Sequence, residues 1–224
     1  MVAVFVAFMF VSLVLADLCI KKWKAGRAAG TPQTAMLAGD DLLQVPENLH
    51  LSDVHTWTRP HPAGGLEIGA DTFIGCAVGT VQRIILPQRG DQVTAGQPLF
   101  RIERDGRTLT VPSALTGIVV TVNGLVAQQP GLLNSDPYGR GWICQITPTA
   151  LSGTPGTMRS GEQAILWLES EFTRLRQFLS TRIPAQLPVG ATSQDGGLPS
   201  AGCLAELDHA AWSAFQAEFL KPKL

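Results

Sequence analysis

Apolar and polar residues follow a strand pattern through the centre of the chain. Residues 79–103 and 107–123 are short runs of β-branched and other apolar side chains, separated by Gly and Pro and without a helical period. Such runs are typical of short strands in a small barrel or flattened sandwich. Asp105-Gly106 lies between the two halves, and this dipeptide favours a type I′ turn, which needs positive φ at both central positions. The pattern predicts a mainly β domain with a hairpin tip at Asp105-Gly106.

An amphipathic helix is predicted after the strands. It begins at Ser160, where a capping-box pattern would let the Ser160 hydroxyl accept from the backbone N–H of Gln163, and it ends before Pro184. Its apolar face consists of Ala164, Ile165, Leu168, Phe172, Leu175, Phe178 and Leu179. We expect this face to pack on the β domain.

A second amphipathic stripe lies in residues 203–224, after a Pro-, Gly- and Ser-rich linker at residues 183–202. Its largest members are Trp212, Phe215 and Phe219. A helix this short is marginal alone in water, so it must dock on another surface. The β domain and a partner protein are both candidates, and the long linker favours the partner. We therefore predict that these three aromatic residues bind a partner protein.

The N-terminus carries an apolar run at residues 2–20, interrupted only by Ser12 and Asp17. About 20 apolar residues suffice to cross a hydrocarbon core about 30 Å thick. Lys21, Lys22, Trp23 and Lys24 follow at once, and no basic residue precedes the run. The positive-inside rule then predicts a single-pass anchor at residues 1–24, with the N-terminus outside and the main domain on the cytoplasmic face of the inner membrane. A cleaved signal peptide is the alternative, but its positive charge would precede the apolar run.

A linker is predicted at residues 25–44, between the anchor and the β domain. It contains several glycines, and its scattered apolar side chains favour contact with a surface over a free tether.

Three motifs lie in register along the β domain. The first is Pro46-Glu47-Asn48-Leu49, a spacer and His55-Thr56-Trp57-Thr58-Arg59; the second is Gly90-Asp91-Gln92-Val93-Thr94-Ala95-Gly96; the third is Asn134-Ser135-Asp136-Pro137-Tyr138-Gly139-Arg140-Gly141-Trp142. Together they resemble the H-protein family of the glycine cleavage system. The resemblance implies a lipoyl-like hybrid barrel-sandwich over residues 45–182, closed by a helix. It also implies a strand and a short helix over residues 66–78.

The residue at the hairpin tip departs from this family. The resemblance implies a lipoyl group on a lysine three residues after a Glu; Glu103 matches the Glu, and Gly106 stands at the lysine position. Every lysine of the chain is one of Lys21, Lys22, Lys24, Lys221 and Lys223, so none lies near the tip. An arginine cannot form the lipoyl amide, because its guanidinium stays protonated. We therefore predict no bound cofactor and a vacant lipoyl position at Gly106.

Composition excludes several other classes. The formal net charge of -1 leaves no basic face for nucleic acid. The four cysteines are scattered without a Cys-x-x-Cys pair, and His50, His55 and His61 match no standard metal spacing. Nucleophile-elbow, phosphate-loop and dinucleotide motifs are absent. We predict neither a metal site nor an enzymatic activity.

Together these features predict a non-catalytic, membrane-anchored, H-protein-like scaffold or accessory subunit of a multi-subunit membrane complex. Its partners would be the other subunits and the lipid bilayer, with respiratory and photosynthetic assemblies as plausible hosts. Two alternatives stay open: a lipoyl-like periplasmic adaptor of a transport system, and an acyl carrier that uses a non-lysine attachment site. Such adaptors insert a long α-hairpin between the halves, where this chain has only residues 104–107.

Overall fold

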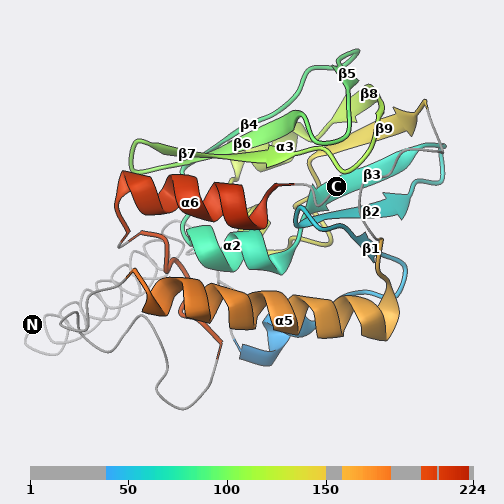
Figure 1. Ribbon diagram of the computed structural model, residues 1–224. Coiled ribbons are helices and arrows are strands. Elements are labelled where there is room, and N and C mark those ends of the chain that lie inside the picture. The colour runs from blue at the N-terminus through green and yellow to red at the C-terminus, as the bar shows by residue number, and fades with distance from the viewer. Residues whose placement is uncertain (1–38, 150–157, 183–197, 206, 222–224) are drawn as a thin grey trace, which may run out of the picture. The chain divides into compact units, whose positions relative to one another are not determined.

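The computed structural model describes residues 39–149, 158–182, 198–205 and 207–221 (Figure 1). The predicted anchor, with Lys21, Lys22, Trp23 and Lys24, lies outside these residues, as do most of both predicted linkers. Within the described ranges, no helix is long and apolar enough to cross a membrane. The membrane span at residues 2–20 therefore stays a prediction.

Two antiparallel sheets form the β domain. The strands are β1 (His50–Leu51), β2 (Thr56–Pro60), β3 (Leu66–Ala70), β4 (Arg83–Ile85), β5 (Gln92–Val93), β6 (Pro98–Arg104), β7 (Arg107–Pro112), β8 (Gly117–Val122) and β9 (Cys144–Pro148). Among the described residues, one sheet has the order β1-β2-β3-β9-β8-β5 and the other the order β4-β6-β7. This arrangement confirms the mainly β barrel-sandwich with C-terminal helices.

The first and third sequence motifs meet in the folded domain. Trp57 is fully buried and donates its indole N–H to the carbonyl oxygen of Pro137 at 3.1 Å. Arg59 pairs with Glu67 and donates to the carbonyl oxygen of Tyr138 at 3.1 Å. Side chains far apart in the sequence thus tie β2 to the loop before β9.

A short helix follows β3, as expected. Helix α2 (Thr72–Val78) begins after Asp71, whose carboxylate accepts from the backbone N–H groups of Phe73 and Ile74. It ends at Gly79, where φ is +73°. All seven residues of α2 are buried, so the helix is part of the core.

Three further short helical segments belong to the domain: η1 (Gly39–Leu43), α3 (Gly124–Gln128) and α4 (Leu132–Ser135). Segments η1 and α4 contact α2, and α3 contacts β4. In η1, Leu42 is buried and its carbonyl oxygen accepts from the Thr72 hydroxyl at 2.6 Å. The described end of the predicted linker at residues 25–44 therefore lies against the domain, as its apolar residues indicated.

The long helix α5 (Gly161–Ser180) follows the predicted stripe. Every predicted member of its apolar face except the partly exposed Ile165 is buried. The capping box was wrong in detail, because Ser160 stands at the N-cap position but makes no side-chain capping bond. The reason is the positive φ of Gly161, +56°, which departs from the helical geometry that a capping box needs at this position.

The C-terminal helix α6 (His209–Phe219) docks on the chain's own domain, which corrects the predicted partner-binding role of Trp212, Phe215 and Phe219. These side chains are 3%, 0% and 2% exposed. Phe215 and Phe219 lie against Phe73 of α2, with ring centroids 6.0 and 5.4 Å apart. Figure 1 shows α6 beside α2, with α5 on the other side of α2. The aromatic residues of α2 and α5 thus supply the apolar surface that the stripe requires.

The packed C-terminal segment also starts earlier than the predicted boundary at residue 203. Pro199 is buried, and the backbone N–H of Gly202 donates to the Cys76 carbonyl oxygen at 2.6 Å. The helix itself starts later, at His209, because Asp208 is its N-cap and accepts from the backbone N–H of Ala211.

Candidate functional site

The hairpin tip has the predicted turn geometry. Asp105 and Gly106 join β6 to β7 with φ values of +49° and +72°. Arg104 and Arg107 are opposite each other in the register of the two strands. Two positive φ values are the signature of the type I′ turn. Gly106 is exposed, and a Cβ atom built on it would meet nothing within 4 Å. The position where the resemblance implies a lysine is therefore an open, solvent-facing turn.

Side-chain hydrogen bonds hold this turn in place. Gln82 donates its amide to the Asp105 carboxylate at 2.8 Å, and the Asp105 backbone N–H donates to the Gln82 side-chain oxygen at 2.9 Å. Arg104 also donates to the Asp105 carboxylate at 3.2 Å. The tip is a braced turn, and Gln82, in the segment before β4, supplies much of the bracing.

The two arginines beside the tip, Arg104 and Arg107, turn toward the C-terminal segment. Arg104 donates to the carbonyl oxygen of Val78 at the end of α2. Arg107 donates to the carbonyl oxygen of Ala205 at 2.9 Å and lies 5.7 Å from the ring centroid of Trp212. Through Arg107 the hairpin is connected to Ala205 and Trp212 of the C-terminal segment.

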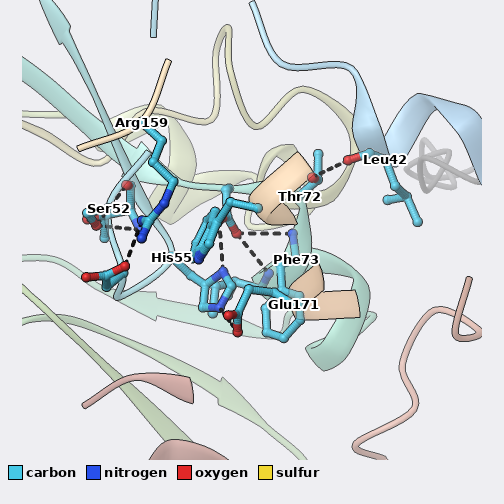
Figure 2. Close-up of polar contacts among 12 residues, drawn as sticks. Leu42, Ser52, His55, Thr72, Phe73, Arg159 and Glu171 are labelled. Carbon is cyan, nitrogen blue, oxygen red and sulfur yellow. Dashed lines mark hydrogen bonds and ion pairs between the residues drawn. The ribbon is translucent and has the colours of Figure 1, made fainter. Parts of the chain in front are cut away.

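A second polar site lies inside the domain, at the contact between α5 and the β domain (Figure 2). His55 is fully buried in the loop between β1 and β2, with φ at +58°. Its Nδ1 lies 2.9 Å from a carboxylate oxygen of Asp71, and its Nε2 lies 3.7 Å from a carboxylate oxygen of Glu171. We refer to His55, Asp71 and Glu171 as the histidine cluster.

Charge determines the ionisation of the histidine cluster. Burial by itself would lower the pKa of His55, but the carboxylates of Asp71 and Glu171 outweigh it and raise that pKa above its ordinary value. Burial also opposes ionisation of Glu171, yet His55 and Arg174 together lower the pKa of Glu171 to about 2. The site therefore favours an imidazolium between two carboxylates.

Sequence reasoning missed this cluster, although one signal for it was present. Glu171 lies between Leu168 and Phe172 on the buried face of α5, and it is only 3% exposed. A carboxylate in an apolar stripe needs a buried partner. His55 and Asp71, however, come from distant parts of the chain, so the pattern could not name them.

The buried thiols offer no reactive group. Burial raises the pKa of Cys76 and of Cys144 to about 12, and it also raises the pKa of Cys203. A thiol with such a pKa is a poor nucleophile at neutral pH, because the thiolate is the reactive form. None of these three residues is therefore suited to carry an acyl group.

Comparison with known proteins agrees with the motifs. The family model described as "Glycine cleavage H-protein" matches residues 49–169, which is more than half of the chain. The glycine cleavage system H protein of Micrococcus luteus is 35% identical over 104 residues, which cover 46% of this chain and 81% of that protein. The H protein of Mycolicibacterium vanbaalenii is 31% identical over 103 residues, covering 46% and 79%.

Among solved structures, the crystal structure of a glycine cleavage system H protein from Mycobacterium marinum aligns with a TM-score of 0.49 and 24% identity, covering 55% of this chain and 98% of that chain. The family match extends from the strand before His55 into α5 and includes the hairpin tip and Asp71. The chain therefore belongs to the glycine cleavage H-protein family.

Proposed function

We propose that this chain is a non-catalytic, membrane-anchored member of the H-protein family that serves as a scaffold or accessory subunit of a multi-subunit membrane complex. The observation that carries the proposal is Gly106 at the exposed tip of the β6–β7 hairpin. A lipoyl amide needs a primary amine, and the lysines of the chain are confined to residues 21–24 and 221–223. A member without the amine keeps the fold of a carrier and loses the carrier's chemistry.

The surroundings of the tip support the same reading. Asp105 is tied to Gln82 by two hydrogen bonds, and Arg107 is tied to Ala205. A guanidinium is not acylated in the way an amine is. The hairpin is thus braced for a structural role, and its solvent-facing position holds a residue with no side chain.

The membrane and complex parts of the proposal rest on the sequence. The apolar run at residues 2–20 has the length of a spanning helix, and the basic flank follows it. Partner subunits would then meet the domain on the cytoplasmic face. Since Trp212, Phe215 and Phe219 are buried in the domain itself, the partner contact is assigned to other, exposed parts of the surface.

The test is the intact mass of the full-length protein purified from its native cells in mild detergent. The expected mass is that of the polypeptide without a lipoyl group. A lipoyl-sized increment on any residue would return the chain to the carrier class. The same preparation tests the complex, because we expect defined partner subunits to co-purify, whereas a monodisperse monomer would contradict the scaffold role.

A further inference from the structure

The two ring nitrogens of His55 each face a carboxylate. Nδ1 lies 2.9 Å from Asp71, and Nε2 lies 3.7 Å from Glu171. A neutral imidazole has one N–H donor and one lone pair, and only the imidazolium has two donors. In either neutral tautomer one lone pair would therefore face a carboxylate oxygen. Nδ1 is at hydrogen-bond distance from Asp71, whereas Nε2 is at ion-pair distance from Glu171 and has no hydrogen-bond partner among the described residues. Both contacts favour the charged ring.

The ring has no access to solvent that could relieve such a mismatch. His55 is fully buried and stacks on Phe73, with centroids 3.9 Å apart and planes 9° apart. The Trp167 ring also contacts the His55 ring, with centroids 5.0 Å apart and planes tilted by 30°. Aromatic faces attract a cation, so this packing also favours the imidazolium over the neutral ring.

The charges around His55 balance only when it is protonated. Glu171 is bound by Arg174, whose Nη1 lies 2.6 Å from one carboxylate oxygen. Asp71 accepts in addition from the backbone amides that start α2. Two cations, His55 and Arg174, then match the two anions, Asp71 and Glu171. Loss of the His55 proton leaves a buried negative charge uncompensated, which is costly.

The remaining charged and titratable groups near the site are paired among themselves or lie farther out. Arg159 and Asp53 pair at 2.7 Å, and the Arg159 guanidinium lies 4.9 Å from the Trp167 ring. The Tyr138 hydroxyl contacts Thr72, next to Asp71, and burial raises the pKa of Tyr138 far above neutrality. Among these groups, His55 is the one whose ordinary pKa lies near neutrality, and its carboxylate partners raise that pKa.

The cluster also joins elements that local sequence does not hold together. His55 comes from the β1–β2 loop, Asp71 from the junction of β3 and α2, and Glu171 from the middle of α5. Figure 2 shows the Glu171 carboxylate beside the His55 ring, with Phe73 next to it. The contact between His55 and Glu171 is therefore a polar connection between α5 and the β domain.

We propose that His55 is a buried proton latch: its imidazolium, hydrogen-bonded to Asp71 and ion-paired with Glu171, holds α5 on the β domain, and loss of the proton weakens that contact. This inference concerns the domain itself and stands independently of membrane anchoring or partner binding. A folded-state pKa raised above the ordinary value gives a stabilisation that is complete below about pH 6.5 and is lost as the pH rises through the folded-state pKa.

The experiment is amide hydrogen exchange on the full-length protein in detergent, followed as protection factors from pH 6 to pH 9. Above about pH 6.5 the proposal predicts that opening of α5 releases the His55 proton, so the protection of the α5 amides should fall by up to about tenfold per pH unit. Amides of β6 and β7 serve as the internal reference and should keep constant protection.

Two variants on the same helix make the test specific. Glu171→Gln removes the charge that faces Nε2 and should flatten the pH dependence. Glu169→Gln removes an exposed carboxylate from the same helix and should leave the wild-type profile intact. A wild-type α5 whose protection does not vary with pH would overturn the proposal. So would an equal effect of the two substitutions.

A direct measurement on the unaltered protein covers the case in which Glu171→Gln fails to fold. Nitrogen NMR of the imidazole distinguishes a ring with two N–H groups from a neutral ring. We expect His55 to carry both protons at pH 7. A neutral His55 ring at that pH would exclude the latch without any substitution.

Discussion

A Cβ atom on Gly79 would lie 2.5 Å from the Cα of Gly202, so the end of α2 and the C-terminal segment touch backbone to backbone. Both glycines have positive φ, +73° and +81°. Next to this contact the backbone N–H of Leu204 donates to the carbonyl oxygen of Ala77 at 3.0 Å. The close approach lets the C-terminal segment reach the tip of the hairpin, where Arg104 lies.

Gly79→Ala should separate the two backbones. The substitution combines a strained φ with a steric clash, so we expect a loss of more than about 2 kcal/mol in the free energy of unfolding. Gly106→Ala is the matched control, because φ is also positive there but no atom lies within 4 Å. It should cost about 1 kcal/mol. Urea unfolding curves measure both, and equal losses would argue against the clash.

Phe215→Ala should destabilise the domain itself. Phe215 is fully buried against Phe73 and Phe178, and removal of a buried Phe side chain costs about 3–5 kcal/mol. Leu166→Ala on α5 is the comparison, since Leu166 is 58% exposed and should change stability by about 0.5 kcal/mol or less. Unchanged thermal stability of Phe215→Ala, together with loss of a co-purifying protein, would restore the partner-binding role.

Gly106→Lys should fold and present an amine at the tip. The cost should be about 1 kcal/mol, because a non-glycine residue must adopt the positive φ. We expect partial lipoylation at most in cells that contain a lipoyl ligase, since the ligase also reads the surrounding hairpin, and Arg104 and Arg107 place charge on both sides of the tip. Thr108→Lys, exposed on β7 but away from the turn, should stay unmodified. Intact mass spectrometry separates the outcomes, and equal modification of both variants would contradict a specific site at residue 106.

Acid should release the bond between Glu171 and its cations. The pKa of Glu171 is lowered from 4.5 to about 2, so its stabilisation is complete above about pH 4.5 and is lost as the pH falls through about 2. Urea midpoints between pH 5 and pH 2 should fall more steeply for the wild type than for Glu171→Gln. Glu169→Gln should follow the wild type, and identical slopes for all three proteins would show that Glu171 contributes nothing in acid.

The proposed membrane anchor implies a topology that two treatments test. The full-length protein should stay with membranes after high-salt and carbonate washing, because a spanning helix resists both. Protease added to intact cells should leave the β domain uncut if, as we propose, the basic flank holds that domain in the cytoplasm. Release by carbonate would reject the anchor, and digestion from outside would reject the orientation.

Local patterns in the sequence were enough for the elements whose geometry is itself local. The Asp105-Gly106 turn follows from two residues that tolerate positive φ, and the apolar face of α5 follows from helical spacing along one segment. The identity of the tip residue is likewise a property of the sequence alone. Residue 106 is a glycine and carries no amine in any fold of the chain.

Only the tertiary structure decided what each apolar face and each buried charge meets. An amphipathic stripe shows which side of α6 avoids water, and it does not show whether Phe73 or another protein covers Phe215. In the same way, Glu171 required a buried partner, but the pairing with His55 depends on how the β1–β2 loop and α5 pack in space. Contacts between residues distant in sequence come from the packing of the whole domain, which no local spacing encodes.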